Sequence, residues 1–287
     1  MKKKRLLITG SNGQLGTSIL DLSERYPAYE FIAAPASFLS SHGESEMGKF
    51  LSDLKPAYII NSAAYTAVDK AESEPEAAML VNGTAVGFLA AFCKAHECNL
   101  IHISTDYVFE GSSARAYTET DAVNPVNIYG KSKLLGEELC REKNPASIII
   151  RTAWVYSEHG KNFVKTMLRL MKEKEKLQVV SDQIGAPTYA ADLAGAIMQI
   201  VDSTRWVPGI YHYANAGQTN WYEFALTIRD LAGLTCDLQP VSTDQYPTAA
   251  RRPAFSLLNT DKIRFTYQLE IPEWKDSLRR CLAIIGS

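Results

Sequence analysis

Short apolar runs alternate with longer amphipathic segments through the first half of the chain. In the runs, a few residues such as Leu, Ile and Phe stand together between turn-forming residues, which is typical of buried strands. In the segments between them, apolar residues recur every three or four positions, the spacing of a helix with one buried face. Strands that alternate with helices predict a parallel, doubly wound α/β sheet. The predicted strands are residues 5–9, 29–34, 57–61, 100–104 and 147–151.

The regular alternation loosens from Ser157 onward. Residues 182–189 combine turn formers with hydrogen-bonding groups, as a polar ligand pocket would. We therefore expect two domains. Residues 1–156 form a nucleotide-binding domain, which residues 190–218 are expected to rejoin, and residues 157–287 form mainly a smaller α/β domain that binds the substrate.

Three glycines, spaced three residues apart, follow the first predicted strand and precede a helix. Gly10, Gly13 and Gly16 let the chain turn tightly, let backbone N–H groups approach a pyrophosphate and let the helix pack close to the strand. This context favours a Rossmann-type, dinucleotide-binding sheet over a plain turn. The second strand ends in residues 35–37, Pro-Ala-Ser, without the carboxylate that an NAD-specific site places there. NADPH is therefore favoured as the cofactor, and NADH is left open.

A tyrosine and a lysine four residues apart, Tyr129 and Lys133, lie near the start of a helix predicted over residues 127–142. That spacing puts the phenol and the ammonium on one helix face. Because a nearby cation favours phenolate, we expect Lys133 to lower the pKa of Tyr129 toward working pH, so that it can exchange a proton with an alcohol or ketone oxygen. A hydroxyl at the carboxyl end of the fourth strand, from Ser104 or Thr105, is placed to meet a substrate oxygen.

The composition is that of an ordinary globular protein, with 46% hydrophobic and 22% charged residues among 287. A net charge of -2 and a pI of about 6.2 give no general attraction to nucleic acid or membranes. The basic start is followed by too short an apolar run for a signal peptide, and no segment is expected to reach the roughly 20 apolar residues of a membrane span. Five scattered cysteines without metal-ligand spacing predict reduced thiols, no metal site and a cytoplasmic location.

Four motifs carry a resemblance to a known family: Gly10-x-x-Gly13-x-x-Gly16, Ser104-Thr-Asp-Tyr-Val-Phe109, Tyr129-x-x-x-Lys133 and Arg151-Thr-Ala-Trp-Val-Tyr156. They resemble the extended short-chain dehydrogenase/reductases and, within them, the dTDP-4-dehydrorhamnose reductases. Later stretches at residues 162–170, 182–188, 221–224 and 252–253 are also similar. The resemblance therefore covers essentially the whole chain.

The resemblance implies reduction of the C4 ketone of dTDP-4-dehydro-β-L-rhamnose to dTDP-β-L-rhamnose. Thr105 would help to hold the carbonyl, Tyr129 would donate the proton, and Lys133 would also bind the nicotinamide ribose. The implied cofactor site consists of Gly10, Asn12, Gly13, Gln14, Leu15, Gly16, Ala63, Ala64, Tyr65, Asn82, Tyr129 and Lys133. The implied substrate contacts are Ser104, Thr105, Asp106, Trp154, Asn162 and Arg252, although a solvated pair of Arg251 and Arg252 is an alternative from the sequence alone.

Two departures from relatives refine these expectations. Tyr107 stands where nucleotide-sugar 4,6-dehydratases carry a glutamate after Thr-Asp, which favours reduction without loss of water. Thr17 and Ser18 stand where some relatives carry a glutamate that helps to hold a metal between two subunits. A monomer without metal is therefore favoured, with a dimer as the alternative.

Two alternative functions stay open. A relative of this fold is a non-catalytic regulatory subunit of methionine adenosyltransferase, but such a protein has no need to keep Thr105, Tyr129 and Lys133 together. The other alternative is a reductase that gives a different dTDP-6-deoxyhexose epimer, because the sequence does not show how the sugar lies in its pocket. Every reductase hypothesis implies a dTDP-4-dehydro-6-deoxy-L-sugar as substrate.

Overall fold

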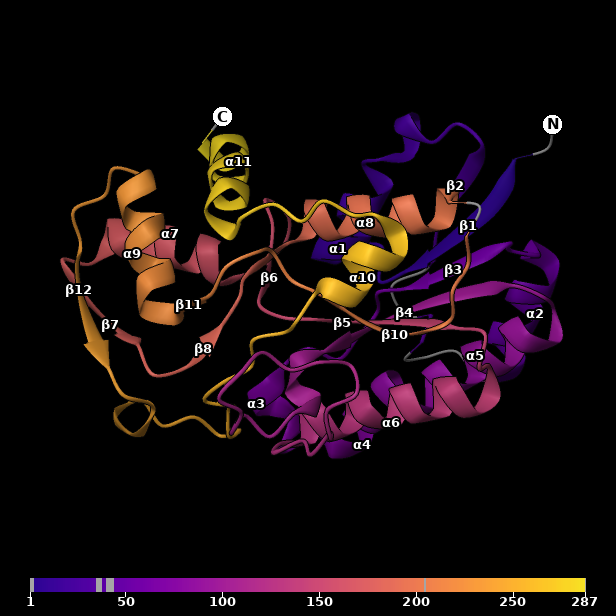
Figure 1. Cartoon of the computed structure of the whole chain (residues 1–287), viewed down its shortest axis with the longest axis horizontal. Helices are drawn as coiled ribbons and strands as arrows, with labels where there is room; N and C mark the ends of the chain where they lie inside the picture. The colour runs from indigo at the N-terminus through magenta and orange to yellow at the C-terminus, as the bar shows by residue number, and fades with distance from the viewer. Residues whose placement is uncertain (1–2, 35–37, 40–43, 204, 287) are drawn as a thin grey trace.

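The computed structural model describes residues 3–34, 38–39, 44–203 and 205–286 of the chain. Its centre is a parallel six-stranded sheet with strand order β10-β5-β4-β3-β1-β2 (Figure 1). The strands are β1 (Lys4–Thr9), β2 (Tyr29–Ala33), β3 (Tyr58–Asn61), β4 (Asn99–Thr105), β5 (Ile148–Thr152) and β10 (Gly209–Tyr213). The five strands predicted from apolar runs all lie in this sheet, which confirms the doubly wound α/β fold. The strand order reverses between β1 and β3, and ligands bind beyond the carboxyl ends of strands at such a reversal.

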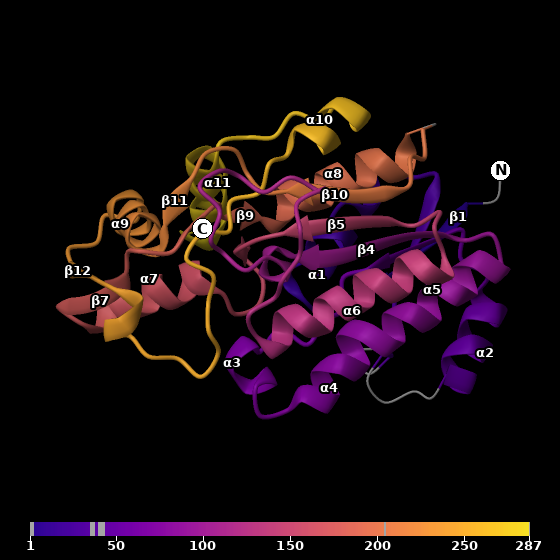
Figure 2. The same ribbon diagram turned by 60° about the horizontal axis from the view of Figure 1, so that its bottom comes forward.

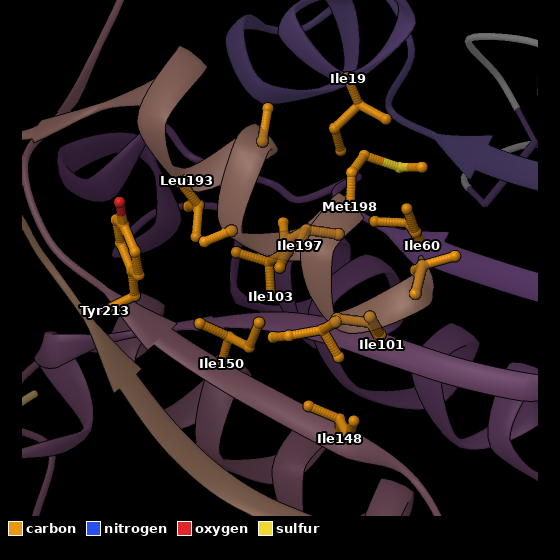
Figure 3. Close-up of a cluster of buried hydrophobic side chains, with 14 of the residues drawn as sticks. Ile19, Ile60, Ile101, Ile103, Ile148, Ile150, Leu193, Ile197, Met198 and Tyr213 are labelled. Carbon is orange, nitrogen blue, oxygen red and sulfur yellow. The ribbon is translucent and has the colours of Figure 1, made fainter. Parts of the chain in front are cut away.

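Helices cover both faces of the sheet (Figures 1 and 2). One face packs against α1 (Gln14–Leu20) and α8 (Ala190–Asp202), the other against α2 (Glu44–Leu54), α5 (Ala85–Ala95) and α6 (Ile128–Lys143). Successive residues of β1 serve the two faces in turn: Leu6 and Ile8 belong to the first core and Leu7 to the second, all fully buried. Figure 3 shows strand isoleucines packed against Ile197 and Met198 of α8. Strands buried on both sides explain why the runs are continuously apolar.

The helical segment between β3 and β4 is interrupted. The structure has α3 (Val68–Ala71), α4 (Pro75–Met79) and a π-helical turn at Leu80–Thr84 that leads into α5. A proline starts α4 because it lacks the N–H that a continuing helix needs. Within the described residues, the stretch Pro75–Ala95 is long and apolar enough to cross a membrane, so the expectation that no segment reaches that length is wrong. However, 56% of its most apolar stretch of 18 residues is buried inside the protein, mainly in the core between the sheet and α2, α5 and α6.

The remaining elements form a smaller unit beside the main sheet (Figure 1). Its main elements are α7 (Phe163–Glu173), β7 (Lys176–Val180), α9 (Trp221–Leu231), β12 (Asp237–Val241) and α11 (Trp274–Gly286). β12 pairs in parallel with β7, and the three helices pack around the buried rings of Phe224 and Trp274. The pairs β6 (Val155–Tyr156) with β9 (Thr188–Tyr189) and β8 (Ile184–Gly185) with β11 (Thr219–Asn220), together with α10 (Asp261–Tyr267), complete the fold.

Candidate active site

A cleft of about 680 Å³ opens at the carboxyl ends of the central strands, where the strand order reverses. Twelve of the residues singled out from the sequence line it: Gly10, Asn12, Gly13, Gln14, Leu15, Gly16, Ala63, Ala64, Tyr65, Ser104, Tyr129 and Lys133. The glycine turn and the tyrosine–lysine pair, more than 110 residues apart in sequence, therefore share one cavity. Residues 35–37, on which the preference for NADPH was based, lie outside the described residues.

The glycine turn leaves no room for side chains. Gly10 has a φ of 65°, and a Cβ on it would stand 2.6 Å from the backbone nitrogen of Ala63 at the end of β3. A Cβ on Gly16 would collide with the carbonyl oxygen of Gly10. Gly13 ends the turn as the N-cap of α1 and has no capping side chain, so the first N–H groups of that helix face the cleft uncovered. This arrangement fits the pyrophosphate of a dinucleotide.

Tyr129 and Lys133 lie on the first turns of α6. Asn127 caps the N-terminus of the helix, and its side chain accepts a hydrogen bond of 2.7 Å from the N–H of Gly130. The ring of Tyr129 meets Tyr107 edge to face, with 5.7 Å between centroids. Lys133 is only 2% exposed, and its ammonium donates a 2.6 Å hydrogen bond to the carbonyl oxygen of Ile103 on β4. The pair is therefore fixed by its own helix and by the neighbouring strand.

Burial controls the charges of this pair. It lowers the pKa of Lys133 to about 8, opposed by the carboxylate of Glu137 one turn further along α6. It raises the pKa of Tyr129 to about 12, although the neighbouring hydroxyl of Thr105 opposes the rise. The expectation that Lys133 lowers the pKa of Tyr129 toward working pH is therefore wrong for this structure. Loss of solvation is the largest effect on the pKa of Tyr129, and the ammonium of Lys133 is bound to a backbone carbonyl.

Three neighbouring side chains at the end of β4 have different surroundings. Ser104 lines the cleft, but its hydroxyl donates to the carboxylate of Glu137, which also forms a buried ion pair of 2.7 Å with Arg151. Thr105 is 5% exposed, donates to Asp106 at 3.0 Å and caps the following turn by accepting from the N–H of Tyr107. Thr105 and Asp106 do not line the cleft itself. Both nevertheless act on Tyr129: the Thr105 hydroxyl lowers its pKa and the charge of Asp106 raises it.

Asn82 supports the wall of the cleft from behind. It is fully buried, in the π-helical turn, and its amide pairs with the backbone N–H and carbonyl of Tyr65 at 2.8 and 3.0 Å. It also donates to Ser132 at 2.9 Å, and Ser132 donates to the carbonyl oxygen of Tyr129. π-helical turns are rare and recur at functional sites. Asn82 thus joins the loop after β3 to the helix that carries Tyr129, rather than facing the cavity.

The predicted substrate contacts of the second half are scattered. Trp154 has a positive φ of 48°, rare for a bulky residue, and stacks on Trp221 with 3.7 Å between ring centroids. Asn162 caps α7 and donates to the side chain of Gln14 at 2.9 Å. Arg252 forms an ion pair of 2.7 Å with Asp69, which holds the pKa of that carboxyl below its ordinary value. Arg252 is therefore paired and not simply solvated.

A second cavity, of about 820 Å³, lies in the smaller unit. Its lining combines aromatic, cationic and amide side chains (Phe163, Trp221, Tyr246, Lys174, Lys176, Gln178, Gln183 and Arg252) with the aliphatic side chains of Met167, Leu170, Leu177, Val179 and Val180. Among the predicted substrate contacts only Arg252 lines it. Trp154 lies between the two cavities, since its stacking partner Trp221 lines the second while its chain neighbour Val155 lines the first.

Comparison with known proteins identifies the family. Residues 4–286 match the family described as RmlD substrate binding domain. A dTDP-4-dehydrorhamnose reductase of Aggregatibacter actinomycetemcomitans is 41% identical over 97% of this chain and 98% of its own length. The chain belongs to this reductase family. Crystal structures of a dTDP-4-dehydrorhamnose reductase from Clostridium acetobutylicum and of another from Bacillus anthracis in complex with NADP each give a TM-score of 0.94 at 37% identity, covering 99% of this chain and 100% of theirs.

Several members of the reductase cleft could not be found from motifs. Thr152 lines it from the end of β5, Val155 from β6 and Lys161 from the loop before α7, and Leu39 lines it from the segment after β2. Thr152 and Val155 stand within the motif at residues 151–156, but no local pattern shows which side chains of that motif face the cleft. Lys161 follows Gly160 in a polar loop, and nothing local shows that this loop lies against the glycine turn.

Proposed function

We propose that the chain reduces the C4 ketone of dTDP-4-dehydro-β-L-rhamnose to dTDP-β-L-rhamnose with NADPH, a step in the supply of dTDP-rhamnose for surface polysaccharide. The observation that carries the proposal is the meeting of Tyr129 and Lys133 with the glycine turn at one cleft. The names of the curated relatives and the NADP bound to the Bacillus anthracis reductase support the same reaction and cofactor. Thr105, Tyr129 and Lys133 are the proposed catalytic residues.

The proposed division of labour follows from the position of each group. The turn around Gly10, Gly13 and Gly16 would hold the pyrophosphate, because its close backbone approach leaves N–H groups facing the cleft. NADPH, when bound, supplies the hydride that is added to C4. Lys133 would bind the ribose hydroxyls in exchange for its present bond to Ile103. Fixing both reactants in one cavity supplies much of the rate enhancement.

Tyr129 would complete the reaction by giving its phenolic proton to the oxygen on C4. A tyrosine with a pKa of about 12 is fully protonated at neutral pH, so the proton donor is present before each turnover. The alkoxide formed by hydride addition is a stronger base than the phenolate, so proton transfer to it is favourable. Positioned proton donation of this kind contributes about 10²–10⁴-fold to the rate.

We infer that the nucleotide part of the substrate occupies the second cavity. Its rings from Phe163, Trp221 and Tyr246 suit a base, and Lys174, Lys176 and Arg252 suit a diphosphate. The sugar would then lie near Trp154, between the two cavities. This supports residues 1–156, rejoined by 190–218, as the cofactor domain and residues 157–287 as mainly the substrate domain. We also infer a cytoplasmic monomer; no group of metal-ligating side chains occurs among the residues that the structure describes.

Purified enzyme tests this function directly. NADPH absorbance should fall when dTDP-4-dehydro-β-L-rhamnose is added, and NMR of the product should show dTDP-β-L-rhamnose. If NMR shows a different C4 epimer, the chain is the alternative reductase that makes another dTDP-6-deoxyhexose. If the chain binds the cofactor but shows no turnover, a non-catalytic regulatory role is favoured.

Tyr129→Phe should abolish nearly all turnover while NADPH binding is kept, because only the proton donor is lost. Tyr222→Phe is the matched control, since its hydroxyl bonds to Leu238 in the smaller unit. Substantial turnover in the Tyr129 variant would overturn the proposed mechanism.

A further inference from the structure

The hydroxyl of Thr105 is held on two sides. It donates to Oδ1 of Asp106 at 3.0 Å and accepts from the N–H of Tyr107 at 3.3 Å. A hydroxyl has a single proton to donate. In the hydrogen bonding seen here, that proton is directed at Asp106 and is therefore withheld from a carbonyl oxygen of the substrate.

Asp106 is an unusual partner for that hydroxyl. Its residue is 2% exposed, and its second oxygen, Oδ2, has no hydrogen-bond partner within the described part of the chain. It forms no ion pair with any described residue. The titratable or polar groups that face it are Thr105 and Tyr107 from its own segment, Tyr129 from α6 and Ser256 from the loop before α10. A buried carboxylate with one free oxygen and no cation is costly to keep ionised.

We propose that Asp106 is a positioning residue that sets the direction of the Thr105 hydrogen bond. As a carboxylate it takes the proton of Thr105. As a carboxylic acid it donates to Thr105 Oγ1, which leaves the threonine proton free for the carbonyl oxygen of the substrate. The only chemical change is the gain of one proton from solvent by Asp106. This inference rests on the proposed function, because the hydrogen bond that Asp106 controls, from Thr105 to the substrate carbonyl, is made during the proposed reduction.

The same switch acts on Tyr129. The negative charge of Asp106 raises the pKa of Tyr129. Protonation of Asp106 therefore removes this charge from beside the proton donor at the same time as it frees the Thr105 proton for the substrate. Burial raises the pKa of Asp106 to about 6, against an ordinary value of 3.8, so the change falls within a range that kinetics can cover. The reduction should be faster below this pKa and slower above it.

The test is the dependence of kcat/KM on pH between about 5 and 8 for the native enzyme and three variants. In the native enzyme kcat/KM should fall about tenfold as pH rises through 6, the effect of losing one hydrogen bond in the transition state. Asp106→Asn should remove this fall, since an amide does not ionise. Asp276→Asn, an exposed change on α11, should keep it.

If Asp106 had only a structural role, the pH dependence of kcat/KM would not depend on the hydroxyl of Thr105. Thr105→Val should lower kcat/KM by about 10²-fold and abolish the fall with pH, because the hydroxyl that is switched is gone. This variant decides the question even if Asp106→Asn does not fold, which thermal unfolding would show. Persistence of the fall in either variant overturns the inference while the proposed function stands. Absence of turnover in the native enzyme at every pH overturns both.

Discussion

The buried ammonium of Lys133 opposes folding stability while it serves the site. Its pKa is about 8 in the folded protein against 10.5 ordinarily, so the folded state binds fewer protons than the unfolded chain between these values. The free energy of unfolding should therefore rise with pH across that window. At pH 7 the charged form costs about 3 kcal/mol by the size of the shift.

Lys133→Met should accordingly raise the free energy of unfolding at pH 7 by about 2 kcal/mol, after about 1 kcal/mol is subtracted for the hydrogen bond lost to Ile103. The gain should disappear above pH 10.5, where both states of the native lysine are neutral. Denaturant unfolding at several pH values measures it. Lys131→Met, on the exposed side of the same helix, is the control, and turnover should be lost only in the Lys133 variant. Equal free energies of unfolding for the native enzyme and Lys133→Met at pH 7 would contradict this account, because they would mean that burial of the Lys133 ammonium has no net cost.

Lys161 is the second cation in the lining of the cofactor cleft, and it is exposed and free of ion pairs with the described residues. A pyrophosphate at the glycine turn would lie within reach of it. Lys161→Ala should weaken NADPH binding about tenfold at low ionic strength, and the difference should shrink with added salt. Titration of NADPH fluorescence measures this. Lys94→Ala, an exposed change on α5, should have no effect, and equal affinities for the Lys161 variant would exclude the contact.

At the scale of single residues, the sequence correctly predicted which groups meet at the cleft wherever a local motif defines them. The glycines, Tyr129 and Lys133 lie at one cleft because each belongs to a short pattern tied to a strand end or a helix start. The pKa of Tyr129 was misjudged because burial depends on residues far away in sequence. The pairing of Arg252 with Asp69, 183 positions earlier, was likewise invisible.

At the scale of elements, glycine controls how closely the π-helical turn at Leu80–Thr84 and α6 approach each other. A Cβ on Gly136 of α6 would overlap the carbonyl oxygen of Asn82, and one on Gly83 would stand 2.6 Å from the side chain of Leu135. This close contact places the π-helical turn, with Asn82, directly against the helix that carries Tyr129 and Lys133. The position of the catalytic pair therefore depends on helix packing as well as on its own helix.

Gly136→Ala should destabilise the protein by about 1–3 kcal/mol, because the backbone of α6 must shift to accept the methyl group. It should also lower kcat more than it changes NADPH affinity, since the shift moves Tyr129. Gly195→Ala is the control: its Cβ would have nothing within 4 Å on α8, so it should stabilise by about 0.5–1 kcal/mol. Thermal unfolding and steady-state kinetics measure both. A Gly136 variant as stable and active as the native enzyme would contradict this account.

The strands were predictable element by element, because a doubly covered sheet requires continuous apolar runs. The interruption between residues 72 and 84 was not, apart from its proline, since a π-helical turn has no pattern of its own. β12 was not predicted, because Asp237, Gln239 and Pro240 leave it too few apolar residues to read as a strand. It is a strand because its backbone pairs with β7, which lies far away in sequence.

At the scale of the molecule, two groups of contacts join the cofactor and substrate units, one at each end of the cleft. At one end the side chain of Gln14 accepts from Asn162 at 2.9 Å and from Ser157 at 3.2 Å. At the other end Arg252 pairs with Asp69, while Asn127 donates to the carbonyl oxygen of Arg251 at 2.8 Å. Gln14 itself lines the cofactor cleft. A ligand that orders the glycine turn would thereby also order the loop that leads into α7.

Replacement of Asn162 separates this link from helix capping. Asn162→Ser should keep the cap on α7 and the native melting temperature, yet raise KM for NADPH about threefold because the bond to Gln14 is lost. Asn162→Ala should do the same and cost about 1 kcal/mol of stability in addition, since the cap is lost too. The family resemblance instead implies that Asn162 contacts the substrate. That role would raise KM for the sugar nucleotide and leave KM for NADPH unchanged in the serine variant, so the two constants measured on one protein distinguish a link between the units from a substrate contact.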